Sequence, residues 1–254
     1  MDGPRVSLLF DVIDLRQEIH AFRELARTFL APGSDAVLRQ AEQDLVGITR
    51  GVGGPFAWQL HPHNPMLTKL SYGSYMPGDE GSLCVHAKVT FIWHLEPVRP
   101  RGDSRPARQV RLSGLASTVV RIIEGDPGGD ELVELAVWRM EVADDAAPGA
   151  YFHVQVLGRD QDEMFPKALD IPRLPGVLAS PLSCMEFAIS ELFQDDWARH
   201  AVRETGPGRR WRSVQAFRHD KQLRWHAEQV AASSGSPWVA WKRAIPPEHL
   251  FLTR

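Results

Sequence analysis

The chain has 254 residues, with 29 Lys and Arg against 32 Asp and Glu and a formal net charge of −3. This balance excludes binding to polyanions through bulk charge, so any contact with nucleic acid needs a local basic patch. Two cysteines are too few for a disulfide framework and predict free thiols in a reducing compartment. The first residues lack the apolar length of a signal peptide or a membrane span, so we expect a cytoplasmic protein without membrane contacts.

The N-terminal residues carry the period of amphipathic helices. Apolar residues recur at spacings of four and three over residues 8–29, and Pro32 and Gly33 end the run. Ser34 or Asp35 can cap a second helix, which a glycine-rich stretch terminates. Because the connection is short, the pattern predicts an antiparallel helical hairpin over residues 6–52.

The pattern changes to a period of two in the middle of the chain. After a loop-rich stretch with one short strand near residues 67–75, apolar and polar residues alternate through 84–95, which is typical of a β-strand. Similar stretches follow at 108–124, 131–142 and 150–157, separated by turn-rich breaks. Consecutive strands with such short connections predict an antiparallel meander sheet of about four to five strands over residues 84–157.

Helical periodicity returns in the last third of the chain. Ser183, followed three residues later by Glu186, resembles a capping box, and we expect helices over residues 183–233. We expect residues 234–254 to form an irregular tail. Strands bracketed by helices are typical of the α+β class, and residues 1–254 are interpreted as a single α+β domain.

Polar residues are placed at corresponding positions of the last two predicted strands. Arg139 and Glu141 lie on one strand, and His153 and Gln155 on the next. If these strands pair, the four side chains share the face opposite the apolar one and lie within about 5 Å of their cross-strand neighbours. A histidine can transfer protons near neutral pH, and an arginine can hold a phosphate. The alternative is the ordinary polar face of an antiparallel sheet.

This pattern resembles small bacterial families of unknown function, some encoded as toxin–antitoxin pairs. They carry an Arg-x-Asp strand, an acidic or Gly/Pro-containing break and a His-x-His strand. The resemblance covers residues 138–203; here Glu141 stands in place of the Asp and Gln155 in place of the second His. It continues through three loop residues into the helix predicted at 183–203; these residues are Asp170, Pro172 and Arg173. The resemblance implies a component of a bacterial conflict or defence system.

The predicted C-terminal helix is basic and rich in tryptophan. Its candidate phosphate contacts are Arg209, Arg210, Arg212, Lys221 and Arg224. Cations bind phosphates and tryptophan can stack on bases, so the segment is a candidate nucleic-acid surface. A solvated basic helix and a surface for an acidic protein partner are the alternatives.

Two hypotheses of function follow. In the first, the protein acts on or binds nucleic acid as a metal-independent ribonuclease that needs no cofactor. His153 would move the proton, Glu141 would support it, and Arg139 with Arg111 would clamp the phosphate. In the second, the protein is a non-catalytic adaptor that binds a protein subunit through its C-terminus and its helical hairpin. An open cleft over the polar sheet face favours the first hypothesis, and a covered face favours the second.

The loop histidines His61 and His63 leave a further question open. Two imidazoles this close can contribute to a zinc site, but the sequence places no cysteine or carboxylate at ligand spacing beside them. We therefore expect no metal in the reaction, and whether these two histidines hold a metal stays open.

Overall fold

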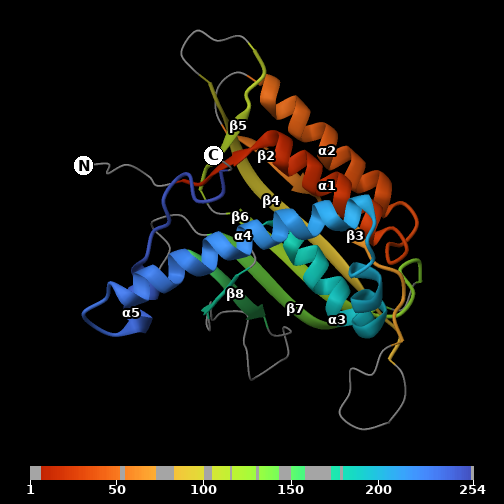
Figure 1. Ribbon diagram of the computed structural model, residues 1–254. Coiled ribbons are helices and arrows are strands. Elements are labelled where there is room, and N and C mark those ends of the chain that lie inside the picture. The colour runs from red at the N-terminus through yellow and green to blue at the C-terminus, as the bar shows by residue number, and fades with distance from the viewer. Residues whose placement is uncertain are drawn as a thin grey trace.

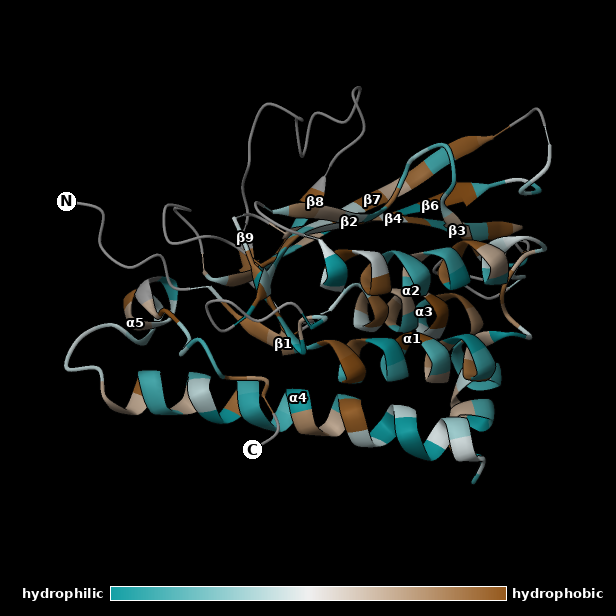
Figure 2. Cartoon of the chain, turned by 90° about the horizontal axis from the view of Figure 1, so that it is seen from above, coloured by the Kyte–Doolittle hydropathy of each residue, from teal (hydrophilic) through white to brown (hydrophobic). Residues whose placement is uncertain are grey.

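The computed structural model describes nine stretches of the chain: residues 7–51, 55–72, 83–99, 105–114, 116–129, 132–142, 150–157, 173–177 and 180–252. These residues form five helices and nine strands, and the strands join in one antiparallel sheet with helices stacked against it (Figures 1 and 2). The α+β class and the antiparallel sheet are confirmed, and the sheet is larger than the four to five strands expected. No helix in the described part of the chain is long and apolar enough to cross a membrane.

The N-terminal hairpin is formed by α1 (Val12–Ala26) and α2 (Ser34–Arg50). The first helix starts later than its apolar spacing indicates, because the preceding residues form strand β1 (Leu9–Asp11), which pairs with β5. Asp11 ends this strand and caps the helix, since its Oδ1 accepts a hydrogen bond from the Ile13 backbone N–H at 2.8 Å. An apolar run at this position is compatible with either a helix or a strand, and its pairing with β5 makes it a strand.

The central strands follow the predicted order. They are β4 (Val85–Val98), β5 (Gln109–Leu112), β6 (Ala116–Glu124), β7 (Val133–Val142) and β8 (Phe152–Leu157). The second predicted strand is broken into β5 and β6, and Gly114, with a φ of 78°, lies in the break. Both pieces pair with β4, β6 then pairs with β7, and β7 pairs with β8. The expected meander is therefore present, with one interrupted strand.

Besides β1, strands β2 (Phe56–Leu60) and β9 (Arg173–Pro175) were not expected from the sequence, and β3 (Met66–Leu67) lies at the start of the short strand expected near residues 67–75. Strands β2 and β3 pair with the other edge of β4. Strand β9 pairs with β8. They are two to five residues long, so they lack the length that makes an alternating pattern recognisable, and their pairing depends on a longer neighbour.

The C-terminal helices are α3 (Pro181–Ala201), α4 (Gly206–Ala231) and α5 (Pro237–Arg243). The first of them is capped by Ser180 and not by Ser183, because the Ser180 hydroxyl accepts from the Ser183 backbone N–H at 3.1 Å. Pro181 occupies the first helical turn, where its missing N–H costs nothing. Helix α5 lies within the stretch predicted as an irregular tail, so that expectation is corrected.

All the labelled helices except α5 stack on one face of the sheet (Figure 2). The alternating apolar side chains of β4, from Val85 to Leu95, point to this face and are buried as predicted. Trp58 of β2 packs edge-on against Phe91 at a ring-centroid distance of 4.7 Å. Helix α4 lies outside α1, so it is separated from the sheet by that helix over much of its length (Figure 2).

A buried charged junction joins α1 to α4. Glu18 of α1 is fully buried, and its Oε2 lies 2.5 Å from the guanidinium of Arg218 on α4. Its Oε1 accepts hydrogen bonds from the Ser180 hydroxyl at 2.7 Å and from the Gln215 amide at 2.8 Å. Arg218 stands in the basic C-terminal stretch of the sequence, yet it belongs to the interior.

Candidate functional site

The predicted polar residues of β7 and β8 do meet on one face of the sheet. Glu141 is the register partner of His153, and Arg139 is the partner of Gln155. Glu141 Oε2 lies 3.0 Å from His153 Nε2, and Glu141 Oε1 lies 3.0 Å from Arg139 Nε. The hydrogen bond of Arg139 Nε goes to Gln155 Oε1 at 2.9 Å, so its contact with Glu141 Oε1 is an ion pair only. The four side chains form one connected polar cluster on the face opposite the helices.

This cluster is closed to solvent at its histidine. His153 and Gln155 are each 2 % exposed and Glu141 is 5 % exposed. His153 Nδ1 lies 2.8 Å from the Ala150 carbonyl oxygen, which can only accept, so this nitrogen carries a proton. The other ring nitrogen, Nε2, makes a hydrogen bond with Glu141. Both nitrogens are therefore engaged within the protein, and neither is directed at a substrate position.

Two residues that could add to this cluster lie elsewhere. Arg111, expected as part of a phosphate clamp, makes an ion pair with Glu248 at 2.9 Å. His86 is buried at the far end of β4, where its Nδ1 donates to the Gly125 carbonyl at 2.8 Å. It stands six residues from Ile92, the residue of β4 in line with the Glu141–His153 pair, which is about 20 Å along a strand. Neither side chain is part of the cluster.

Most of the α4 residues predicted to contact phosphates make ion pairs within the protein instead. Arg209 and Arg212 both pair with Glu204, at 3.6 and 2.7 Å. Arg224 pairs with Asp220 at 2.7 Å. Arg210 and Lys221 are exposed, and no carboxylate among the described residues pairs with them. The basic stretch therefore presents less free positive charge than its composition indicates.

The interleaved tryptophans also differ from the expectation. Trp211 and Trp225 are 1 % and 4 % exposed, so they are core residues and cannot stack on bases. Trp238 of α5 is 48 % exposed, and its neighbour Val239 is 45 % exposed. Because the tail was expected to be irregular, sequence reasoning missed this surface; the pair of apolar residues following Pro237 was the available signal.

His226 is a buried polar residue at the contact between α5 and α4. His226 lies among aromatic rings, with centroids 4.5 Å from Trp225 and 4.9 Å from Trp241. Neither of its ring nitrogens has a hydrogen-bond partner among the described residues. Burial lowers the pKa of His226 from 6.5 to about 4, so the folded protein holds it neutral at pH 7.

This buried histidine predicts a loss of stability in mild acid. Between pH 6.5 and 4 the unfolded chain binds a proton at His226 that the folded chain does not bind, so stability falls as the pH falls. We expect this site to cost about 2 kcal/mol of unfolding free energy between pH 8 and pH 5. Urea denaturation of the wild type and of His226→Phe measures it, since the variant removes the titrating group. Equal pH slopes for the two proteins would contradict the assignment.

An apolar groove lies beside α3 on the helical face. Its volume is about 420 Å³, and it is lined by Trp138, Met140, Val154, Val156, Gly176, Val177, Phe187 and Glu191. Val156 lies on the apolar face of β8 but is 41 % exposed, because the helices cover only the start of this strand, where Phe152 is 0 % exposed and packs against Trp225 of α4 with ring centroids 5.8 Å apart. The alternation of β8 correctly predicts the face on which Val156 lies but not how far the cover extends.

No cluster of three or more His, Cys, Asp or Glu side chains suited to a metal ion occurs among the described residues. His61 and His63 stack on each other with centroids 5.0 Å apart, and the His63 backbone N–H donates to His61 Nδ1 at 3.2 Å. This bond occupies one of the four ring nitrogens of the two histidines, so His61 could bind a metal only through its Nε2.

Comparison with known proteins adds no relative. No protein-family model, curated protein or solved structure matches the chain significantly. The function is therefore argued from the geometry alone.

Proposed function

We propose that this chain is a non-catalytic binding subunit that attaches to a partner protein through the outer surface of α4 and α5. The observation that carries the proposal is the exposure of large apolar side chains on these two contacting helices. Leu223 is 53 % exposed, Trp238 is 48 % exposed and Val239 is 45 % exposed. Scattered exposed aliphatic residues are common, but an exposed tryptophan beside other apolar residues is typical of interfaces.

Two further observations support binding over catalysis. Both ring nitrogens of His153 are engaged, and the ring is buried, so the cluster lacks the open access that a proton-transfer catalyst needs. Arg209, Arg212 and Arg224 are each paired with a carboxylate, which reduces attraction to phosphates. Lys221 and Lys242 are exposed on the same two helices and supply positive charge beside the apolar residues in the sequence.

The proposal predicts that a surface change on α5 releases the partner. The full chain, tagged and expressed in its native cells, is recovered after nuclease treatment, and its co-purifying proteins are compared with those of the Trp238→Ala, Val239→Ser double variant. We expect the variant to lose the partner while its melting temperature stays unchanged, since both side chains are exposed.

The matched control is Val202→Ser, which removes an apolar side chain that is 68 % exposed near the opposite end of α4. This helix of 26 residues is about 39 Å long, so the two positions are well separated. The control should keep the partner. Equal recovery in all three proteins, or release of the partner by the nuclease alone, would contradict the proposal.

One observation favours a second candidate, a metal-independent ribonuclease of a bacterial conflict or defence system. The continuous Arg139, Glu141 and His153 contacts have the distances that an acid–base pair beside a phosphate clamp requires. Cleavage of RNA by the full chain in the presence of a chelator tests this candidate, and loss of that cleavage in His153→Ala would support it.

A further inference from the structure

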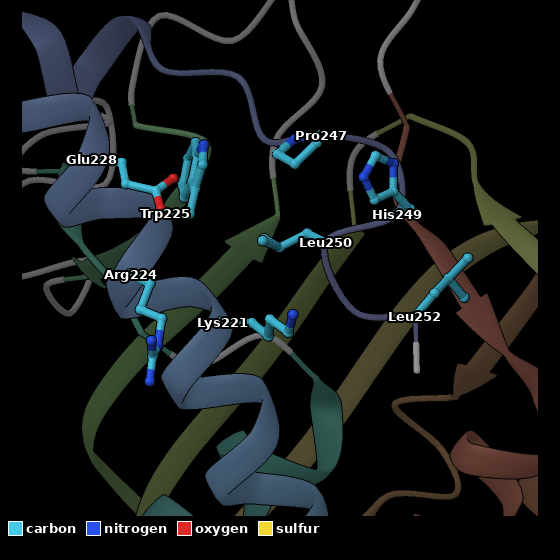
Figure 3. A pocket seen from close by; sticks show the side chains of 8 residues that line it. All are labelled: Lys221, Arg224, Trp225, Glu228, Pro247, His249, Leu250 and Leu252. Atoms are coloured by element: carbon cyan, nitrogen blue, oxygen red, sulfur yellow. The ribbon is translucent and has the colours of Figure 1, made fainter. Parts of the chain in front are cut away.

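A groove of about 480 Å³ lies between α4 and the C-terminal segment. One wall is a single stripe of the helix, formed by Lys221, Arg224, Trp225 and Glu228. The other wall is formed by Pro247, His249, Leu250 and Leu252 (Figure 3). The spacing of the helical residues, three and four apart, places them on one face, so the groove runs along the helix.

Both walls of this groove are firmly held. On the helix side, Arg218 is bound to buried Glu18, and the Gln222 amide donates to the Gly176 carbonyl at 3.0 Å. On the other side, the Leu9 backbone N–H donates to the Glu248 carbonyl at 2.8 Å, and the Glu248 side chain binds Arg111. A groove between two anchored walls is formed before a ligand arrives, which lowers the entropy cost of binding.

The groove combines an apolar lining with one unneutralised cation. Its apolar lining is formed by Trp225 and Leu250, which are 4 % and 7 % exposed, and by Leu252, which is half-buried and the most exposed of the three. The Lys221 ammonium lies 5.6 Å from the centroid of the Phe217 ring, and no carboxylate in the described part of the chain pairs with it. In Figure 3 its amine points from α4 into the space before Leu250. Arg224 points away from that space and is bound to Asp220.

We propose that this groove binds an acidic segment of a partner protein, with a carboxylate on Lys221 and an adjacent apolar side chain against Leu252. This inference rests on the proposed binding function and names the site and the partner's chemistry. A peptide fits better than nucleic acid, because Glu228 lines the same groove and would repel successive phosphates. A peptide can place its acidic and apolar side chains separately.

The test selects binders of the full chain from a random peptide library and measures them by fluorescence anisotropy. We expect the selected peptides to carry Asp or Glu beside Leu, Phe or Trp. Lys221→Glu should weaken them about five- to tenfold, because it replaces attraction with repulsion at an exposed site. Lys221→Arg should retain binding, and added salt should weaken it.

The matched control is Lys69→Glu, which makes the same change of charge at an exposed lysine outside the groove. It should leave peptide affinity unchanged. Selected peptides without acidic residues, equal affinity for Lys221→Glu and the wild type, or displacement of the peptide by a single-stranded oligonucleotide would each overturn the inference.

The two proposals fail in different ways. If Trp238→Ala with Val239→Ser releases the native partner while Lys221→Glu binds the peptides normally, the binding function stands and the groove assignment is overturned. If Lys221→Glu weakens the acidic peptides but no protein partner is lost from any variant, the groove assignment stands and the proposed function is wrong.

Discussion

Glu18→Ala and Arg218→Ala should each lower the free energy of unfolding by about 3–5 kcal/mol, because each leaves a buried charge without its partner. Glu18 is fully buried and accepts hydrogen bonds from Arg218, Ser180 and Gln215, so its removal also leaves polar donors unsatisfied. Equilibrium urea denaturation followed by circular dichroism measures the loss. Both helices, α1 and α4, should unfold in one transition.

The matched control for this junction is the double variant Glu18→Leu, Arg218→Met. Apolar side chains of similar size remove both charges together, so the double variant should lose far less stability than the sum of the two single losses. The single variants Glu18→Leu and Arg218→Met complete the double-mutant cycle, and additive losses in it would contradict a direct interaction between the two charges. The cycle also separates the pair from the packing of the aromatic residues around it.

The sequence pattern predicts those helices and strands in which buried residues recur at a regular spacing. The alternation through β4 correctly assigns Val85 to Leu95 to the core, because each second residue meets the same layer of helices. Strands β2 and β9 have no such repeat, since they are short and gain their register from β4 and β8. Their existence depends on contacts between distant segments, which no short window of sequence contains.

Arg218 shows why charge patterning alone misassigns an interior residue. In the sequence it stands among arginines of a basic helix, and its partner Glu18 precedes it by 200 residues. Only the packing of α4 across α1 makes it a buried ion pair. The same packing buries Trp211 and Trp225, which removes the aromatic residues from the surface expected to bind nucleic acid.

The polar cluster was predictable in part. Period-two alternation on two paired strands is sufficient to place Glu141 opposite His153, and the register agrees. Alternation states which side of the sheet a residue occupies, but not whether that side is covered. The 2 % exposure of His153, which favours the binding function over catalysis, therefore could not be read from the sequence.

His153→Ala separates these functions by experiment. If the protein is a binding subunit, the variant loses about 2–4 kcal/mol of unfolding free energy, because a buried ring and its two hydrogen bonds are removed. Glu141→Gln should lose less, since its amide can still donate to His153 Nε2. Partner binding at α4 and α5 should survive both changes at temperatures where the variants are folded.

If the protein is a ribonuclease, we expect different results. Wild-type protein would cleave RNA in a chelator, His153→Ala would lose this cleavage at a temperature where it is folded, and Glu141→Gln would lose part of it. Such cleavage requires the buried imidazole to become accessible, so it should be slow unless the region around Ala150 opens. Cleavage that is abolished by His153→Ala would therefore overturn the non-catalytic proposal and show that burial of the ring is a closed state of an active site.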